Sequence, residues 1–170
     1  MRAQLLLMAG WLAVTAVQGA DPKSDNRTDA AAAFARLKTL VGEWEADTQK
    51  GKDHLSYELT GGGTAVVERE TAEQMPGMLT VYHLDRDRLI LTHYCMAGNQ
   101  PRMQARAFNP ASGDLQFQFL DITNLSSPGA GHMHNVRLRL VDHDHFQSEW
   151  QFYEDGKPKF SETATYVRVR

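Results

Sequence analysis

The sequence predicts an all-β fold, an antiparallel up-and-down β-barrel of about ten strands with one short N-terminal helix. Apolar and polar residues alternate along short segments from residue 43 onward, the pattern of half-buried strands. Turn residues such as Gly61-Gly62-Gly63 and Asp155-Gly156 separate these segments at hairpin spacing. Little chain remains for crossover helices, and closure removes the unpaired edges of so long a meander. An open sandwich is the structural alternative.

Residues 1–20 resemble a signal peptide. Met1-Arg2 gives a short positive start, residues 5–17 are mostly apolar, and Gly19-Ala20 offers small residues for cleavage. The apolar run is short for a bilayer span, so we expect a secreted or periplasmic protein with no membrane span after signal removal. An uncleaved anchor is the alternative. Residues 21–28 are polar, and we expect a disordered leader.

One domain is expected over residues 29–170. Thr28 or Asp29 can cap a helix that begins at Ala30, because Phe34, Leu37 and Val41 recur at helical spacing and Gly42 suits its end.

After Gly42 the hydrophobic period changes to two. Parity then assigns faces: Val136, Leu138 and Leu140 point inward, and His134 and His132 share that parity if the strand extends so far. The expected strands are 43–48, 54–60, 64–71, 78–84, 88–96, 103–109, 115–121, 134–141, 146–153 and 160–169.

The hairpin near residue 86 leaves an alternative open. A three-residue loop, Asp85-Arg86-Asp87, would place His83 and His93 on one face. A loop of two or four residues would place them on opposite faces.

Charge and cysteine content exclude some classes. The net charge of −3 becomes −4 when Arg2 leaves with the signal, so neither nucleic acid nor an anionic membrane is expected as a partner. The single cysteine, Cys95, has no internal disulfide partner, and we expect it to be buried. Its redox state and the oligomeric state are not determined by the sequence.

The helix followed by Gly42-Glu43-Trp44 at the start of the first strand resembles the calycin superfamily, which includes lipocalins and fatty-acid-binding proteins. The resemblance implies that an Arg from the last strand, Arg168 or Arg170, lies across the indole. Gly42, Trp44 and Arg168 would then close the base of the barrel.

A second motif, His93-Tyr94-Cys95 followed by Gly98-Asn99-Gln100-Pro101-Arg102-Met103, is similar to a family of small secreted bacterial calycin-like proteins of unknown function. The similarity covers residues 37–170 and implies no activity. Nitrobindin-like haem barrels carry a longer Gly-rich repeat after the tryptophan, and Glu45-Ala46-Asp47 stands there instead. The sequence therefore does not favour haem.

His132-Met133-His134 is a candidate metal motif. On a strand, the two imidazoles would lie on one side with Cα atoms roughly 7 Å apart, close enough to share an ion. His93 is the first choice for a third ligand, and Zn²⁺ or another divalent metal would suit such a set. The alternatives are a polar pocket lining and a surface loop.

We expect the barrel to bind a small, partly apolar ligand. Directed polar groups at one end of an apolar pocket are typical of ligand sites. The expected wall is Leu138, Phe117, Phe119, Trp150 and Phe152, and the expected polar residues are His83, His93, Tyr94, Asn99, Gln100, Arg102, Asn124, His132 and His134.

Two rival functions remain. One is a periplasmic metal-binding protein or metal-dependent enzyme that uses His132, His134 and His93. The other is a protein-interaction module whose barrel is filled by its own side chains. No catalytic residue is assigned, because no nucleophile motif such as Gly-x-Ser-x-Gly is present.

Overall fold

A computed structural model describes residues 29–72 and 75–169 of the chain. The predicted signal peptide (1–20) and leader (21–28) lie outside the described residues. Within the described part, no helix has the length and hydropathy needed to span a membrane.

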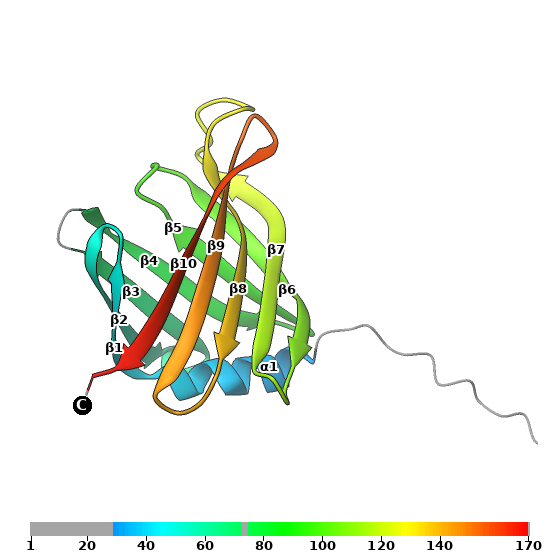
Figure 1. Cartoon of the computed structure of the whole chain (residues 1–170). Coiled ribbons are helices and arrows are strands. Elements are labelled where there is room, and N and C mark those ends of the chain that lie inside the picture. The colour runs from blue at the N-terminus through cyan, green and yellow to red at the C-terminus, as the bar shows by residue number, and fades with distance from the viewer. Residues whose placement is uncertain (1–28, 73–74, 170) are drawn as a thin grey trace, which may run out of the picture.

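Ten antiparallel strands close into a barrel, as the alternation predicted. Their order around the wall is β1-β10-β9-β8-β7-β6-β5-β4-β3-β2, so every strand pairs with its sequence neighbours and β10 returns to β1 (Figure 1). The strands are β1 (Gly42–Thr48), β2 (Gly51–Thr60), β3 (Ala65–Ala72), β4 (Met75–Asp85), β5 (Arg88–Tyr94), β6 (Gln100–Asn109), β7 (Asp114–Thr123), β8 (His132–Leu140), β9 (His145–Glu154) and β10 (Lys157–Arg168).

Helix α1 (Ala30–Leu37) runs across one end of the barrel (Figure 1). Asp29 caps it by accepting a hydrogen bond from the Ala32 amide at 2.9 Å. Phe34 and Leu37 are buried against the barrel core. The short 3₁₀ helices η1 (Lys38–Leu40) and η2 (Gly61–Gly63) connect α1 to β1 and β2 to β3. This end is therefore closed, and the loops that follow β5, β7 and β9 lie at the other end.

Trp44 and Arg168 join the first and last strands at the closed end. The two residues are paired across β1 and β10, and the Arg168 guanidinium carbon lies 4.1 Å from the indole ring centroid. Arg168 also donates to the Val41 and Thr39 carbonyls, each at 2.8 Å. Gly42 has φ +128, and a Cβ there would lie 2.8 Å from an Arg168 nitrogen, so this position favours glycine.

The hairpin between β4 and β5 has a two-residue loop, because Asp85 pairs directly with Arg88. Thr80 therefore faces His93 across the pair, and His83 faces Ile90. The hypothesis of a three-residue loop, which placed His83 and His93 on one face, is therefore wrong. His93 points into the barrel, and His83 lies on the opposite face of the sheet.

A β-bulge at His134 changes the parity of β8. Met133 pairs with Phe152 and Asn135 pairs with Gln151, so His134 is the extra residue. Met133 therefore faces the interior of the barrel, where His132 and His134 were predicted to lie. The prediction that His132 and His134 point inward is wrong, because simple alternation does not continue through a bulge.

Candidate functional site

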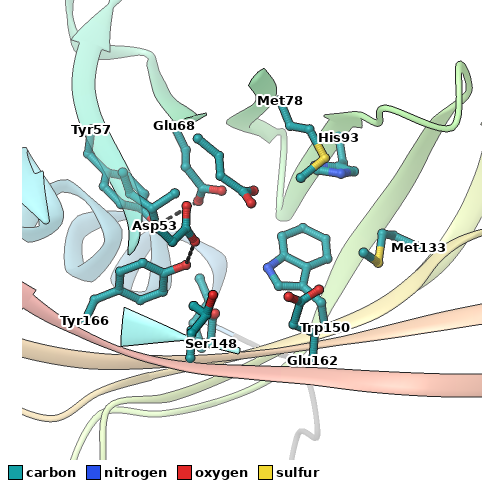
Figure 2. A pocket seen from close by; sticks show the side chains of 15 residues that line it. Asp53, Tyr57, Glu68, Met78, His93, Met133, Ser148, Trp150, Glu162 and Tyr166 are labelled. Carbon is teal, nitrogen blue, oxygen red and sulfur yellow. Dashed lines mark hydrogen bonds between the residues drawn. The ribbon is translucent and has the colours of Figure 1, made fainter. Parts of the chain in front are cut away.

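A cavity of about 40 Å³ lies inside the barrel (Figure 2). Such a volume has room for about three water-sized groups. Polar and apolar side chains from both halves of the chain form its wall: Thr48, Asp53, Leu55, Tyr57, Glu68, Glu70, Met78, His93, Met133, Leu138, Ser148, Trp150, Glu162, Ala164 and Tyr166.

Glu68 is the most enclosed carboxyl group of this cavity, with 4% of its surface exposed. Its Oε2 accepts hydrogen bonds from the Tyr57 and Tyr82 hydroxyls at 2.6 and 2.7 Å. The Thr80 hydroxyl donates to its Oε1 at 3.3 Å. Burial raises the pKa of Glu68, and these donors oppose that rise. Burial also holds the pKa values of both tyrosines well above their usual range.

Asp53 lies on the same side of the cavity as Glu68 (Figure 2), and one of its oxygens has no hydrogen-bond partner among the described residues. Its Oδ2 accepts a hydrogen bond from the Tyr166 hydroxyl at 2.5 Å (Figure 2). Its Oδ1 is buried and has no hydrogen bond within the structure. Burial raises the pKa of Asp53. An unpaired buried acceptor is costly unless a ligand or water satisfies it.

Glu70 adds a third carboxyl group to the same wall. Burial, followed by the charges of Asp53 and Glu68, raises the pKa of Glu70 to about 8. Two of these acidic side chains come from adjacent positions on one face of β3. The deep part of the cavity is therefore rich in hydrogen-bond acceptors, and its charge becomes more negative as pH rises through about 8.

His93 lies at the other side of the cavity, where 2% of its surface is exposed. Its Nδ1 is 3.0 Å from the Thr80 hydroxyl oxygen. When Thr80 donates to the Glu68 carboxylate, that oxygen accepts from His93 Nδ1–H, which leaves a lone pair on Nε2. Nε2 is buried and has no hydrogen-bond partner among residues 29–72 and 75–169. Burial lowers the pKa of His93 to about 4, so the imidazole is neutral at pH 7.

A second cavity of about 270 Å³ lies at the open end of the barrel. It shares Met78, Met133 and Glu162 with the inner cavity. Its wall is mainly sulfur-bearing and aromatic, and consists of Lys50, Met75, Met78, Cys95, Met96, Ala97, Met133, Phe152, Phe160 and Glu162. We call it the outer cavity. The prediction that Cys95 is buried is confirmed.

The predicted wall residues divide between these regions. Leu138 and Trp150 line the inner cavity, and Phe152 lines the outer one. Phe117 is buried in the core beside Tyr82, with ring centroids 5.9 Å apart.

Three predicted polar residues connect the loops at the open end to one another. The Asn99 amide donates to the Gly131 carbonyl at 2.9 Å, and the Asn124 amide donates to the Gly98 carbonyl at 2.5 Å. Gln100 accepts from the Thr123 hydroxyl at 2.8 Å. None of the three lines either cavity. Their interactions hold the β5–β6 loop against the β7–β8 loop.

Two further predicted residues face outward. Tyr94 is 48% exposed. Arg102 forms an exposed ion pair with Asp121 across β6 and β7, with Nε 2.6 Å from Oδ1. Like His83, neither lines the cavities. Of the predicted polar set, only His93 lines the inner cavity.

His132 and His134 form a separate aromatic cluster with Phe119 and Tyr153. The His134 ring is stacked between Phe119 and Tyr153, with centroid distances of 4.5 and 4.0 Å. His132 Nε2 lies 3.1 Å from His134 Nδ1, and His132 Nδ1 lies 3.0 Å from the Ala130 carbonyl oxygen. These contacts involve both ring nitrogens of His132 and Nδ1 of His134. Burial, with the charge of His132, lowers the pKa of His134.

The predicted metal triad is not assembled. His93 lies beside Trp150, with ring centroids 4.8 Å apart, whereas His132 and His134 lie in their own cluster. Across residues 29–72 and 75–169, no group of three His, Cys, Asp or Glu side chains is placed to hold a metal ion. The bulge in β8 is the physical reason that His132 and His134 do not lie beside His93.

Sequence reasoning missed the acidic residues of the inner cavity. Glu68 and Glu70 share the parity of buried Val66, so alternation along β3 could have placed them inward. That signal was obscured because Val66 and Val67 are both apolar and point to opposite faces. Asp53 similarly shares the parity of buried Leu55 and Tyr57.

The fold and cavities define a closed antiparallel barrel that is compatible with ligand binding. The sequence matches no protein-family profile and has no significant match among curated proteins. Among solved structures, the chain is similar to the crystal structure of Rv2717c from M. tuberculosis, with a TM-score of 0.55 and 15% identity over 84% of this chain and 100% of that chain. At this identity the similarity shows the fold alone.

Proposed function

We propose that this protein is a calycin-like barrel that binds a small ligand with a positively charged, hydrogen-bond-donating head and an apolar remainder. The observation that carries the proposal is Asp53 Oδ1, a buried acceptor that has no partner in the described part of the chain and lies in a cavity that Glu68 and Glu70 also line. The histidine- and arginine-lined polar end expected from the sequence is replaced in this proposal by an acidic interior.

The charge of the inner cavity favours an ammonium group. Burial raises the pKa values of Asp53, Glu68 and Glu70. The surrounding protein groups therefore do not fully offset the cost of burying these carboxylates in their charged form. A protonated amine supplies up to three donors and a positive charge, and it would stabilise those ionised forms.

The two cavities set the size of the ligand. The inner cavity has room for a head of about three heavy atoms. The outer cavity, at about 270 Å³, offers methionine and phenylalanine side chains to an apolar chain. An alkylamine of moderate length matches both regions. A barrel filled by its own side chains, the interaction-module hypothesis, has no need of such cavities.

A matched ligand series tests the proposal. Hexylammonium, hexanol and hexanoate share one chain length and differ in the head group. We expect hexylammonium to raise the melting temperature most, because a ligand that binds only the folded state stabilises it by RT ln(1 + [L]/Kd). Asp53→Asn should reduce that response at least tenfold in Kd while keeping an oxygen acceptor for Tyr166. Glu149→Gln, on the outward face of β9, is the control.

Two results would overturn this function. One is equal stabilisation by hexanoate and hexylammonium, which would show that the acidic wall does not select the head group. The other is an Asp53→Asn variant that binds hexylammonium as tightly as the original chain.

Export remains part of the proposal, supported by the composition of residues 1–20. Mass spectrometry of the protein from its native source should find a mature chain that begins at Asp21. A chain that retains Met1 would contradict cleavage of the signal peptide, and a chain found in the cytoplasmic fraction would contradict export.

A further inference from the structure

Methionines gather at the open end of the barrel. The described residues contain five of them, and four line the outer cavity: Met75, Met78, Met96 and Met133. The fifth, Met103, is buried in the barrel core. Thioether sulfur is a soft, neutral ligand that selects soft metal ions such as Cu(I).

Two of these methionines extend to the inner cavity and meet His93 there. Met78, Met133 and His93 all line that cavity, and Figure 2 shows the three side chains at the same end of it. Thr80 pairs directly with His93, and Met78 is two residues farther along β4 on the same face. Such diagonal positions lie within reach of long side chains.

The free nitrogen of His93 is suited to metal binding. Nε2 is buried in the cavity wall, where no described residue forms a hydrogen bond with it, and Nδ1 lies 3.0 Å from the Thr80 hydroxyl oxygen. A hydrogen bond to one ring nitrogen fixes the tautomer and directs the lone pair of the other.

Trp150 and the acidic wall add attraction for a cation. The Trp150 ring lies 4.8 Å from the His93 ring, centroid to centroid, and lines the same cavity. An indole face attracts a nearby positive charge. Glu70 and Glu162, whose carboxyl groups line this cavity as well, contribute negative charge when ionised.

We propose that the protein binds one monovalent soft metal ion, Cu(I), through His93 Nε2 and the thioether sulfurs of Met78 and Met133, beside the Trp150 ring. The ligands are all neutral, so the ion and its ligands together carry a net charge of +1. Cu(I) binds as Cu(I), without oxidation or reduction. This site goes beyond the proposed amine site, because its ligands lie at the opposite side of the inner cavity from Asp53 (Figure 2).

Cys95 is not part of the proposed ligand set. It lines the outer cavity but not the inner one. Cys95→Ser therefore separates a thioether site from thiol capture.

Silver(I), which has similar ligand preferences and no accessible redox chemistry, is the probe. The full chain is dialysed against micromolar silver nitrate without chloride, and bound silver is measured by mass spectrometry while tryptophan emission, to which Trp11, Trp44 and Trp150 contribute, is followed. We expect one ion per chain and quenching of that emission. Met78→Leu/Met133→Leu and His93→Gln should each weaken binding at least 100-fold. Met103→Leu and Cys95→Ser should retain it.

Leucine is close to methionine in volume, so the double variant should keep the fold, and circular dichroism checks this. Trp150→Phe should lose the fluorescence response and keep the bound silver. Retained binding in the double variant, or loss of binding only in Cys95→Ser, would overturn the proposal. So would the absence of bound silver in the original chain. Hexylammonium titration of the double variant distinguishes this failure from failure of the amine site, which depends on Asp53.

Discussion

Replacing Glu70 by glutamine should change how the stability of this protein depends on pH. Glu70 lines the inner cavity, and burial raises its pKa from 4.5 to about 8. Between these two values the folded chain holds a proton that the unfolded chain has released. Rising pH therefore favours the unfolded chain across this interval, and the free energy of unfolding decreases. Glutamine keeps the size of the side chain and removes the ionisation.

The interval from pH 6.5 to 8 isolates this effect from His93. Burial lowers the pKa of His93 from 6.5 to about 4, so its contribution to stability is lost only as pH falls below 6.5. Each pH unit corresponds to about 1.4 kcal/mol for a group protonated in one state only. Across this window the free energy of unfolding of the original chain should fall by about 2 kcal/mol relative to Glu70→Gln.

Urea unfolding at several pH values between 6.5 and 8 measures this difference. Tryptophan fluorescence and circular dichroism should give coincident transitions, as two-state behaviour requires. Glu149→Gln, whose side chain faces away from the barrel interior, is the matched control. Parallel stability curves for the original chain and Glu70→Gln would refute the reasoning, since they would mean that Glu70 ionises alike in folded and unfolded chains.

Four further outcomes follow from the structure. Arg168→Ala should lower the free energy of unfolding by about 2–3 kcal/mol in urea, because carbonyls and the indole lose a cationic donor; an unchanged midpoint would contradict this. Gly113→Ala should cost about 2 kcal/mol or more, since its Cβ would lie 2.1 Å from a backbone oxygen, whereas Gly98→Ala meets open space and should cost about 1 kcal/mol. Equal costs would show that crowding is not the cause. Thr80→Val should destabilise the chain by about 1–3 kcal/mol, because the buried Glu68 carboxyl group and the His93 ring each lose a hydrogen-bond partner. Thermal melts check this, and a variant as stable as the original chain would be inconsistent with it. Hexylammonium affinity should increase between pH 6 and 9 as Glu70 ionises, and calorimetry showing a flat or opposite trend would exclude that link.

The predicted polar end shows where alternation along a strand stops being informative. His93 lines the inner cavity, on the same face of β5 as Leu89 and Leu91, and alternation along the strand indicated that shared face. His132 and His134 were assigned by extending the parity of Val136 and Leu138, and the bulge interrupts that parity. A bulge has no reliable signature in a single sequence, because its extra residue is chosen by the pairing of neighbouring strands.

The acidic cavity required the closed barrel before it could be recognised. Asp53 on β2, Glu68 on β3 and Tyr166 on β10 are distant in sequence, and only closure of β1 against β10 brings them to one interior. The sequence also placed Asn99, Asn124 and Arg102 at one end of the barrel. Their partners, loop carbonyls and an exposed aspartate, became visible only with the fold.

The sequence by itself determined the strand pattern, the capped helix and the Gly42-Glu43-Trp44 start of the barrel, because each depends on local periodicity, capping or one backbone conformation. The tertiary structure alone decided which polar side chains share the interior. That outcome depends on hairpin loop length, on one bulged residue and on the pairing of the first and last strands. Each of these features changes which face of a strand points into the barrel, or which strands lie next to each other. They depend on contacts between segments that are distant in sequence, so a local sequence pattern does not predict them.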